Sequence, residues 1–600
     1  MEVIVNWVSK LYPLILLTKF CKNLGAYVSD FCKEIYQQFL TRHTYLISCP
    51  TGRGKSQMVI NKIIPLAFKQ KKKVLLLVNR TRLAEQYLKD IRSIVVKGII
   101  DYNPSFHSLA NDYDHCLLVM TYQQLEYRLS NNLEATLLEL DKYDIVVADE
   151  VHYWLNDSTF NPGNRLSAEA VLMYLCTKTR YLMSATMDEI KPILLQPGSY
   201  MKPLFTPQDR FYNPILQESV SPAEYSTYAV RNFEYIMPAD YSYLDVHYFN
   251  KIDVIIDCIV NSNASSKWLI FINSRKRGRE LVEKIKRQYL AAHPNCNEDE
   301  IVVFISSDYR DIEEDDMKDV MEEILEHEIV KAKVLVTTSV LDNGVSLKSK
   351  DLLHIVIFAD NKVSFIQMLG RKRIYSEEEK VHLYIPAMDK SFFLKRLKRI
   401  EELFNDTDQV SFINFDAFMT SILYSGKDSR GDSLCKVAFP FIESINRTRH
   451  SHFIPNELSR YQLRLLYENY QKIIDRFETD GDSAFIKEQL DWLGLVYDRS
   501  RWLADNSEVR LKREFEQKLS PYLSKEFSGE ILKRILKELK PEIRNIFKEI
   551  RSNRIYPKHL NFSLQSVGSD YRVVVVKEDL YKITDCPDKV ELIKEEDFEL

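Results

Sequence analysis

The 600-residue chain lacks the cysteine patterns that define several classes of small domain. Its nine cysteines are scattered, and none forms a Cys-x-x-Cys pair, which argues against a zinc module and gives no disulfide framework. We therefore expect reduced thiols and a cytoplasmic location. A strong charge of one sign is also missing. The formal net charge is −4, so any site for nucleic acid must be a local feature of the surface.

Long apolar segments are absent as well. A short apolar run at Leu11–Leu17 cannot span a bilayer, and Glu2 is the only charged residue before Lys10, so the basic start of a signal peptide is missing. We interpret this run as a buried helix in an N-terminal helical extension, residues 1–30, and expect no membrane partner. The sequence also contains no internal repeat, no low-complexity tract and no nuclease motif. Glycine is sparse, with 15 in the chain, so clustered glycines are informative.

Short runs rich in Val, Ile and Leu alternate with longer helical stretches in two series. The first series is 45–49, 74–79, 117–122, 145–150 and 181–186, and the second is 268–273, 301–306, 334–338, 355–360 and 381–385. Nearly continuous apolar runs are typical of strands buried on both faces of a parallel sheet. Alternation of strand and helix implies βαβ units with right-handed crossovers. The sequence therefore predicts the α/β class, with two tandem parallel-sheet domains.

The domain boundaries follow from changes in this pattern. We predict a first α/β domain, a proline-rich linker, a second α/β domain and a mostly α-helical C-terminal region, at residues 31–195, 196–232, 233–392 and 393–600 respectively. The density of proline in the linker disfavours regular structure.

Two features of the C-terminal region are informative. Residues 571–576 are apolar and predict a strand near the C-terminus. Residues 532–551 place basic and apolar side chains on two faces of a helix that Pro541 interrupts. Two interpretations of the basic face remain open: a solvated surface over a packed helix, or a surface that follows a phosphate backbone.

Residues 45–56 have the pattern of a strand, a glycine-containing loop and the start of a helix. Such a loop turns back on itself and points backbone N–H groups at phosphate oxygens, and the helix that begins at Lys55 adds its positive N-terminus. Lys55 would contact the β- and γ-phosphates of ATP, and the Ser56 hydroxyl would hold Mg²⁺. Cys49 stands where the strict phosphate-loop pattern has glycine. The remaining loop residues of the predicted nucleotide site are Thr51, Gly52, Arg53 and Gly54.

The second motif is acidic: Asp149-Glu150-Val151-His152 lies at the end of a buried strand. Ligands of open α/β sheets bind at the carboxyl ends of strands, where these acids lie. Asp149 would bind Mg²⁺, and Glu150 would orient and deprotonate the attacking water.

Together these motifs resemble superfamily 2 helicases, whose DExH box corresponds to Asp149–His152. The resemblance extends over about residues 30–390. Within the superfamily, the chain looks most like helicase-like ATPases of bacterial plasmids, conjugative elements and defence loci. It implies two RecA-like domains. The other segments that resemble motifs of this family, in order, are 79–86, 120–123, 184–186, 271–275, 334–346 and 367–373.

The resemblance also implies roles for individual residues. Gln37 would contact the adenine, although a helix-surface glutamine is an equally good reading, and Gly344 would lie at the nucleotide. His152, Ser184 and Thr186 would couple hydrolysis to domain movement. The residues implied at the γ-phosphate are Gln367, Arg371 and Arg373, and those implied at the nucleic-acid backbone are Arg82, Thr121, Ser274 and Thr338.

The last motif departs from the family pattern. The usual form places its second arginine at position 374, where this chain has Ile374, and the arginine stands at 373. On a helix, one residue rotates a side chain by about 100°, so either the helix start is adjusted or Arg371 alone faces the γ-phosphate.

The function implied is a nucleic-acid-dependent ATPase that uses ATP and Mg²⁺ to move along or unwind single-stranded or forked DNA or RNA. The alternatives are a translocase or a nucleic-acid-sensing ATPase without strand separation, each with a protein partner in a defence, restriction or replication complex.

Overall fold

The computed structural model describes residues 16–21, 27–96, 116–161, 163–201, 211–213, 218–220, 230–306, 324, 328–338, 347–374, 379–409, 438–445, 448–503, 526–528, 562–567 and 570–575. The chain divides into two compact units, Met1–Leu503 and Ala504–Leu600. Gly344 and the predicted helical segment 532–551 lie outside the described residues. No helix in the part of the chain that the structure describes is long and apolar enough to cross a membrane.

The first domain is built on a parallel sheet of seven strands in the order β1-β9-β2-β6-β5-β3-β4. The strands are β1 (Leu16–Phe20), β2 (His43–Ser48), β3 (Val74–Val78), β4 (Leu117–Thr121), β5 (Ile145–Asp149), β6 (Thr179–Ser184) and β9 (Arg231–Ile236). The central strands are buried on both faces, as expected for continuous apolar runs between two layers of helices.

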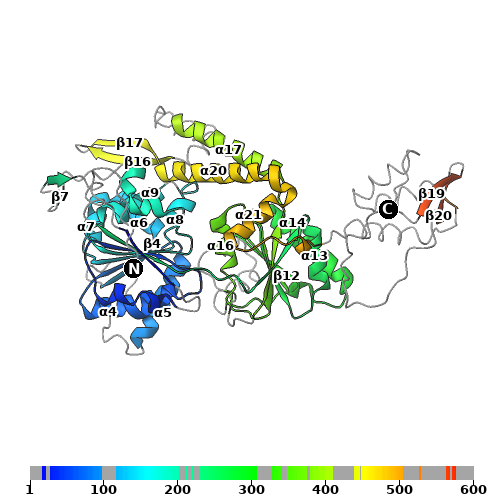
Figure 1. Cartoon of the computed structure of the whole chain (residues 1–600), viewed down its shortest axis with the longest axis horizontal. Helices are drawn as coiled ribbons and strands as arrows, with labels where there is room; N and C mark the ends of the chain where they lie inside the picture. Colours follow the sequence, from blue (N-terminus) through cyan, green and yellow to red (C-terminus); the bar gives the residue numbers. More distant parts are fainter. Residues whose placement is uncertain are drawn as a thin grey trace. The chain divides into compact units, whose positions relative to one another are not determined.

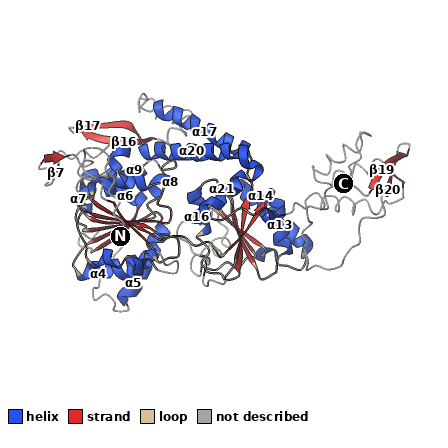
Figure 2. Ribbon diagram, in the orientation of Figure 1, coloured by secondary structure: helices blue, strands red, loops and turns tan. Residues whose placement is uncertain are grey.

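Helices cover both faces of this sheet (Figure 1 and Figure 2). On one face pack α1 (Val28–Phe31), α2 (Lys33–Gln37), α4 (Ile64–Lys69) and α5 (Thr81–Val96). On the other pack α6 (Tyr122–Asn131), α7 (Leu133–Leu140), α8 (Tyr153–Asn156), α9 (Asn164–Glu169), α10 (Lys191–Leu195) and α11 (Pro197–Tyr200). The short α3 (Lys55–Met58) begins directly after the phosphate loop. These helices cover the faces of the sheet, and the candidate site lies at the carboxyl ends of the strands.

Five strands of this sheet were predicted, but β1 and β9 were not. Leu16 and Leu17, expected in a helix, begin strand β1 instead, because they pair in parallel with β9. Strand β9 in turn lies beyond residue 195, where the first domain was expected to end. Its Glu234 is buried and bonded to Thr18 and Lys191, so a charged residue inside the strand concealed its apolar pattern.

The second domain repeats the architecture with a parallel sheet of six strands in the order β10-β15-β14-β11-β13-β12. The strands are β10 (Leu244–Phe249), β11 (Lys267–Phe271), β12 (Val302–Ile305), β13 (Val334–Thr337), β14 (Leu352–Ile357) and β15 (Val381–Pro386). Its described helices include α13 (Ile252–Asn261), α14 (Arg275–Ala292) and α16 (Lys362–Leu369). The two sheets confirm the predicted α/β class, and among the described strands of this domain only β10 was missed.

Two long helices follow the second sheet, α17 (Lys390–Gln409) and α20 (Glu457–Asp480), and lie side by side (Figure 1). The N-terminus of α20 contacts the first domain, because the Ser459 hydroxyl donates to Ser158 O at 2.6 Å and Leu458 joins the core beneath α8 and α9. At its other end, α21 (Ala484–Leu493) packs Ile486 and Leu490 into the second domain. The pair α20–α21 therefore contacts both domains.

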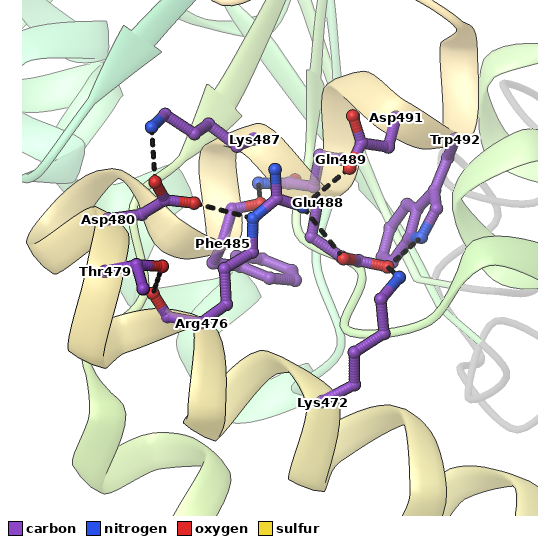
Figure 3. Close-up of polar contacts among 10 residues, drawn as sticks. All are labelled: Lys472, Arg476, Thr479, Asp480, Phe485, Lys487, Glu488, Gln489, Asp491 and Trp492. Carbon is purple, nitrogen blue, oxygen red and sulfur yellow. Dashed lines mark hydrogen bonds and ion pairs between the residues drawn. The ribbon is translucent and has the colours of Figure 1, made fainter.

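Figure 3 shows the polar contacts that join α20 to α21. The buried carboxylate of Glu488 accepts from Lys472 Nζ at 2.9 Å, Arg476 Nη1 at 3.1 Å and Trp492 Nε1 at 3.2 Å. Arg476 also binds Asp480 and Asp491. Charge-assisted bonds of this kind fix the angle between the two helices.

The C-terminal region also contains antiparallel strands, most of which the sequence did not predict. A hairpin of β16 (Ala438–Ile445) and β17 (Thr448–Pro455) precedes α20. In the second unit, β18 (Glu526–Ser528), β19 (Phe562–Val567) and β20 (Asp570–Val575) form a small sheet. Strand β20 confirms the strand predicted at 571–576. A short hairpin also joins β7 (Phe211–Asn213) to β8 (Glu218–Val220), within the predicted linker.

Candidate functional site

The phosphate loop connects β2 to α3 and depends on two glycines. Gly52 and Gly54 have φ values of 82° and 85°, a conformation that residues with a Cβ rarely adopt. Cys49 is fully buried and does not share this conformation, and its N–H donates to Ser184 O at 3.0 Å. The loop therefore needs no glycine at position 49. Lys55 is buried, and its Nζ donates to Cys49 O at 2.9 Å.

The acidic motif lies at the carboxyl end of β5, opposite the loop. Glu150 has a positive φ of 55°, which is uncommon for a residue other than glycine and is often found at functional sites. Its Oε1 is 3.8 Å from Lys55 Nζ. Asp149 Oδ1 accepts the backbone N–H of Glu150 at 3.0 Å. The turn therefore brings two carboxylates and one buried ammonium group together.

The surroundings of the two acids shift their pKa values in opposite directions. Burial, reinforced by the charge of Glu150, raises the pKa of Asp149. Burial acts on Glu150 in the same direction, but Lys55, His152 and Arg371 together outweigh it and hold the pKa of Glu150 below its usual range. Lys55 is shared by the two carboxylates, so the negative charge of Asp149 is only partly balanced. The electrostatics of the site therefore favour an additional cation beside Asp149.

Tyr87, on α5, is a site residue that the sequence analysis missed. Its hydroxyl donates to Asp149 Oδ2 at 2.8 Å and also bonds to the Ser56 side chain. It therefore joins the two side chains predicted to hold Mg²⁺. The ring is fully buried in the core between α5 and the sheet, so in sequence Tyr87 reads as an ordinary apolar position of a helix.

Three predicted coupling residues form one chain of contacts. His152 Nδ1 lies 3.2 Å from Glu150 Oε2 and 3.1 Å from Ser184 Oγ. Ser184 Oγ in turn accepts the backbone N–H of Thr186 at 3.0 Å. The segment after β6 is thereby connected to the acidic motif through a buried imidazole.

The expectation of helical phase at the last motif is wrong. Helix α16 ends at Leu369, and a turn follows in which Arg371 N donates to Met368 O. Lys372 then forms an isolated parallel bridge with Leu347, whose N–H donates to Arg371 O and whose carbonyl accepts from Arg373 N. Arg371 and Arg373 flank the bridged residue and are not on one helix, so the isoleucine at 374 does not determine which arginine faces the site.

This segment lies against the phosphate loop. A methyl group on Gly52 would come within 2.9 Å of Arg373 Nη1, and a methyl group on Gly370 would come within 2.2 Å of Thr51 Oγ1. Arg371 Nη2 donates to Gln367 Oε1 at 2.8 Å. The buried Nε2 of Gln367 has no hydrogen-bond partner among the residues that are described. The structure therefore brings all three predicted γ-phosphate residues to one place.

The predicted adenine contact is less well placed. Gln37 is exposed at the end of α2. Tyr27, which the sequence analysis did not single out, is 60% exposed, and its ring lies 3.4 Å from the position of a Cβ on Gly54. The backbone there is fixed by a bond of 3.0 Å from Val28 N to Arg53 O. The structure therefore places an exposed aromatic ring beside the phosphate loop, which the sequence analysis did not identify.

The four residues predicted at nucleic acid all lie at or shortly after the carboxyl ends of strands. Arg82 lies on α5 after β3, and Ser274 caps α14 after β11. Thr338 follows β13 and is buried. Thr121 is also buried, and its hydroxyl accepts Gln124 N at 3.1 Å in a capping box, so in this structure its side chain serves α6.

Comparison with protein families matches both α/β domains. Residues 21–189 match the model described as type III restriction enzyme, res subunit, and residues 250–373 match the helicase conserved C-terminal domain. The first match contains the phosphate loop and the acidic motif, and the second ends at Arg373.

Individual proteins are more distant. The chain is 27% identical to ATP-dependent RNA helicase DHX58 of Mus musculus over 144 residues, which is 21% of this chain and 20% of that protein. The match thus spans about a fifth of that relative's length. Dbp5 of S. cerevisiae, bound to RNA and ADP BeF3, is 15% identical with a TM-score of 0.38, covering 62% of this chain and 90% of that chain. Helicase Lhr of Mycobacterium smegmatis, bound to ssDNA and AMP-PNP, is 14% identical with a TM-score of 0.39, covering 72% and 59%.

Proposed function

Because the chain carries the two-domain core of superfamily 2 helicases, we propose that it is a nucleic-acid-dependent ATPase that couples hydrolysis to movement along, or unwinding of, DNA or RNA. The observation that carries the proposal is the meeting of a buried lysine, two carboxylates and two arginines from two domains around one glycine loop.

The residues of the first domain fit ATP with Mg²⁺. The positive-φ glycines and the start of α3 provide backbone N–H groups for phosphate. The Ser56 hydroxyl and the Asp149 carboxylate, both bonded to Tyr87, are hard oxygen donors of the kind that Mg²⁺ prefers. When bound, the ion would neutralise charge on the phosphates.

Glu150 is the proposed base for the attacking water. In the structure Lys55 lies close to its carboxylate and lowers its pKa. A triphosphate would attract the Lys55 ammonium group, which would leave Glu150 more basic. ATP binding would therefore activate the base, and His152 would transmit the change to Ser184.

The second domain would complete the site. The amide nitrogen of Gln367 has no partner among the described residues, Arg371 acts electrostatically on Glu150, and Arg373 reaches the loop at Gly52. Cationic donors at this position stabilise charge on a transferred phosphoryl group, which is worth about 10³–10⁵-fold in related enzymes.

We propose the carboxyl ends of the strands in both domains as the surface for nucleic acid. Arg82 and Ser274 are at least partly exposed there and could bind phosphate oxygens. Such contacts do not read bases, so binding would be independent of sequence.

The test is ATPase activity measured with single-stranded DNA, duplex DNA and RNA in parallel. We expect stimulation by at least one of them in the wild type. Lys55→Ala should lose nucleotide binding, whereas Glu150→Gln should bind ATP and hydrolyse it poorly. Lys62→Ala, an exposed lysine seven residues after Lys55, is the matched control and should be unchanged. Near-normal turnover in Glu150→Gln would refute the assignment of the base.

A translocase without strand separation is the second candidate. The match of residues 21–189 to a restriction-enzyme subunit favours it. A protein partner in a restriction, defence or replication complex would then supply the other activity. Strand-displacement and translocation assays on the same substrate separate the two candidates: translocation without displacement supports the second.

A further inference from the structure

A histidine–carboxylate cluster lies in the second domain, away from the nucleotide site. Asp245 and His247 are alternate residues of β10, and His382 is the register partner of Asp245 on the neighbouring strand β15. All three side chains therefore point to one face of the sheet. They stand at the second and fourth positions of β10 and the second position of β15, near the amino ends of these strands. The proposed ATP and nucleic-acid contacts follow the opposite, carboxyl ends.

The three ligand atoms form a nearly equilateral triangle. His247 Nε2 is 3.2 Å from His382 Nδ1 and 3.2 Å from Asp245 Oδ2, and His382 Nδ1 is 3.1 Å from the same carboxylate oxygen. Atoms bound to one ion at about 2.0–2.1 Å lie about 3.3 Å apart in a tetrahedral site and about 2.9 Å apart when bonds meet at right angles. The triangle thus has the dimensions of one face of a metal coordination shell.

Hydrogen bonds alone do not satisfy this arrangement. A neutral imidazole nitrogen is either a donor or an acceptor, and an ionised carboxylate only accepts. If both nitrogens donate to Asp245, two N–H groups face each other at 3.2 Å. If His247 donates to His382, an imidazole acceptor faces the carboxylate oxygen at 3.1 Å. A cation bound to all three atoms removes the conflict.

The surroundings hold these atoms in place. Arg501 binds the other carboxylate oxygen, Oδ1, and leaves Oδ2 for the triangle. The rings of His247 and Tyr384 stack at 5.1 Å, and those of His382 and His354 stack at 5.0 Å. Partners of this kind fix the orientation of metal ligands. The side chains of Asp245, His247 and His382 are 28%, 19% and 37% exposed, so water can reach the remaining coordination positions.

From this geometry we propose that Asp245, His247 and His382 bind one divalent transition-metal ion, with Zn²⁺ or Fe²⁺ as its class. Two imidazoles and one carboxylate are the donors that these ions share, whereas Mg²⁺ and Ca²⁺ prefer oxygen. The role of the ion in this proposal is structural, since its ligands come from two neighbouring strands. Arg501 and its neighbours lie along the free side of β10, where Leu503 N donates to Tyr248 O at 2.8 Å. The ion would fix β10 to β15 beside the residues that lead into the second unit.

The experiment uses the full chain, stripped with a chelator and then titrated with Zn²⁺ and with Co²⁺. We expect one tightly bound Zn²⁺ per chain and an increase in the unfolding temperature on binding. Bound Co²⁺ should show d–d absorption, whose intensity reports four or six coordination. ATP and its analogues are omitted, and excess Mg²⁺ is present so that the proposed nucleotide site does not contribute.

Asp245→Asn and His382→Asn are the test variants, because both replacements are close in size to the native side chains. Each should lose the bound ion and the metal-dependent increase in unfolding temperature. His293→Asn is the matched control: His293 is exposed at the end of α14 and bonds through its Nε2 to Val260 O, so this variant should keep the ion. Absence of a stoichiometric ion in the wild type, or equal binding in Asp245→Asn and His382→Asn, would overturn the proposal.

Discussion

Gly370→Ala tests whether the two domains close in the way that the contacts at the phosphate loop indicate. The added methyl group would lie 2.2 Å from Thr51 Oγ1, 2.8 Å from Thr51 Cγ2 and 2.9 Å from Thr51 Cβ. Rotation about the threonine side chain cannot relieve all three contacts, because the Cβ atom does not move with that rotation. The loop itself is held by the positive φ angles of Gly52 and Gly54. The domains must therefore separate locally by about 1 Å to restore van der Waals contact.

The expected effect is on catalysis and not on folding. Gly370 has φ −68°, which alanine adopts without strain, so the substitution should leave stability unchanged or raise it by about 0.4–1 kcal/mol. A displacement of 1 Å at a reacting centre can cost about 10²-fold in rate. We therefore expect kcat to fall by about 10²-fold, while ATP binding to the first domain changes little.

The assay is steady-state ATPase activity beside equilibrium binding of a fluorescent ATP analogue. Gly163→Ala is the matched control, since Gly163 has the same φ of −68° and its methyl group would meet only Asn161 Oδ1, at 3.3 Å. In a Thr51→Gly background, Gly370→Ala should have little further effect, which a double-mutant cycle measures. Wild-type kcat in the single Gly370→Ala variant would show that Gly370 does not meet the loop during turnover.

Three other predictions follow from buried contacts. Tyr87→Phe should raise the Mg²⁺ concentration for half-maximal ATPase by about 10–100-fold, because the hydroxyl that orients Asp149 is lost, and an unchanged Mg²⁺ dependence would contradict this role. Burial raises the pKa of Glu126 to about 7, so the folded protein retains a proton that the unfolded chain loses above about pH 4.5. The free energy of unfolding of the wild type should therefore fall between about pH 4.5 and pH 7. Glu126→Gln lacks this titration, so its free energy of unfolding should rise by roughly 3 kcal/mol relative to that of the wild type over the same pH range. The same pH dependence of urea unfolding in both proteins would refute this. Glu488→Gln should destabilise the α20–α21 joint by about 1–3 kcal/mol in thermal unfolding, and Lys472→Gln, which changes an exposed partner, by less than about 1 kcal/mol; equal effects would contradict the buried role of Glu488.

Most of the α/β core could be predicted because its strands are uninterrupted apolar runs. The strands that escaped prediction contain polar residues with specific partners. Glu234 in β9 is neutralised by Lys191, and Asp245 and His247 alternate with apolar residues in β10. A pattern based on hydrophobicity cannot anticipate partners that arrive from distant parts of the chain.

The site shows the same division. Lys55, Asp149 and Glu150 lie in contiguous motifs, so local sequence was sufficient to bring them to the loop and to the end of β5. Tyr87 and Tyr27 reach the site only through tertiary packing. The end of the helix before Arg371 was missed because the motif was treated as one helix, although Gly370 was a signal in the sequence that the helix ends there.

Helix α20 has a mechanical consequence for the two domains. Its 24 residues form a rod about 36 Å long, and an α-helix does not stretch under ordinary thermal forces. One end is fastened to Ser158, just beyond α8 and the acidic motif, and the other is braced through α21 against the second domain. The span between these two attachment points is therefore constant. We therefore expect the domains to move by rotation about the ends of α20 and not by translation along it, so that a displacement of the short helix after Glu150 is transmitted to the second domain as a change in tilt.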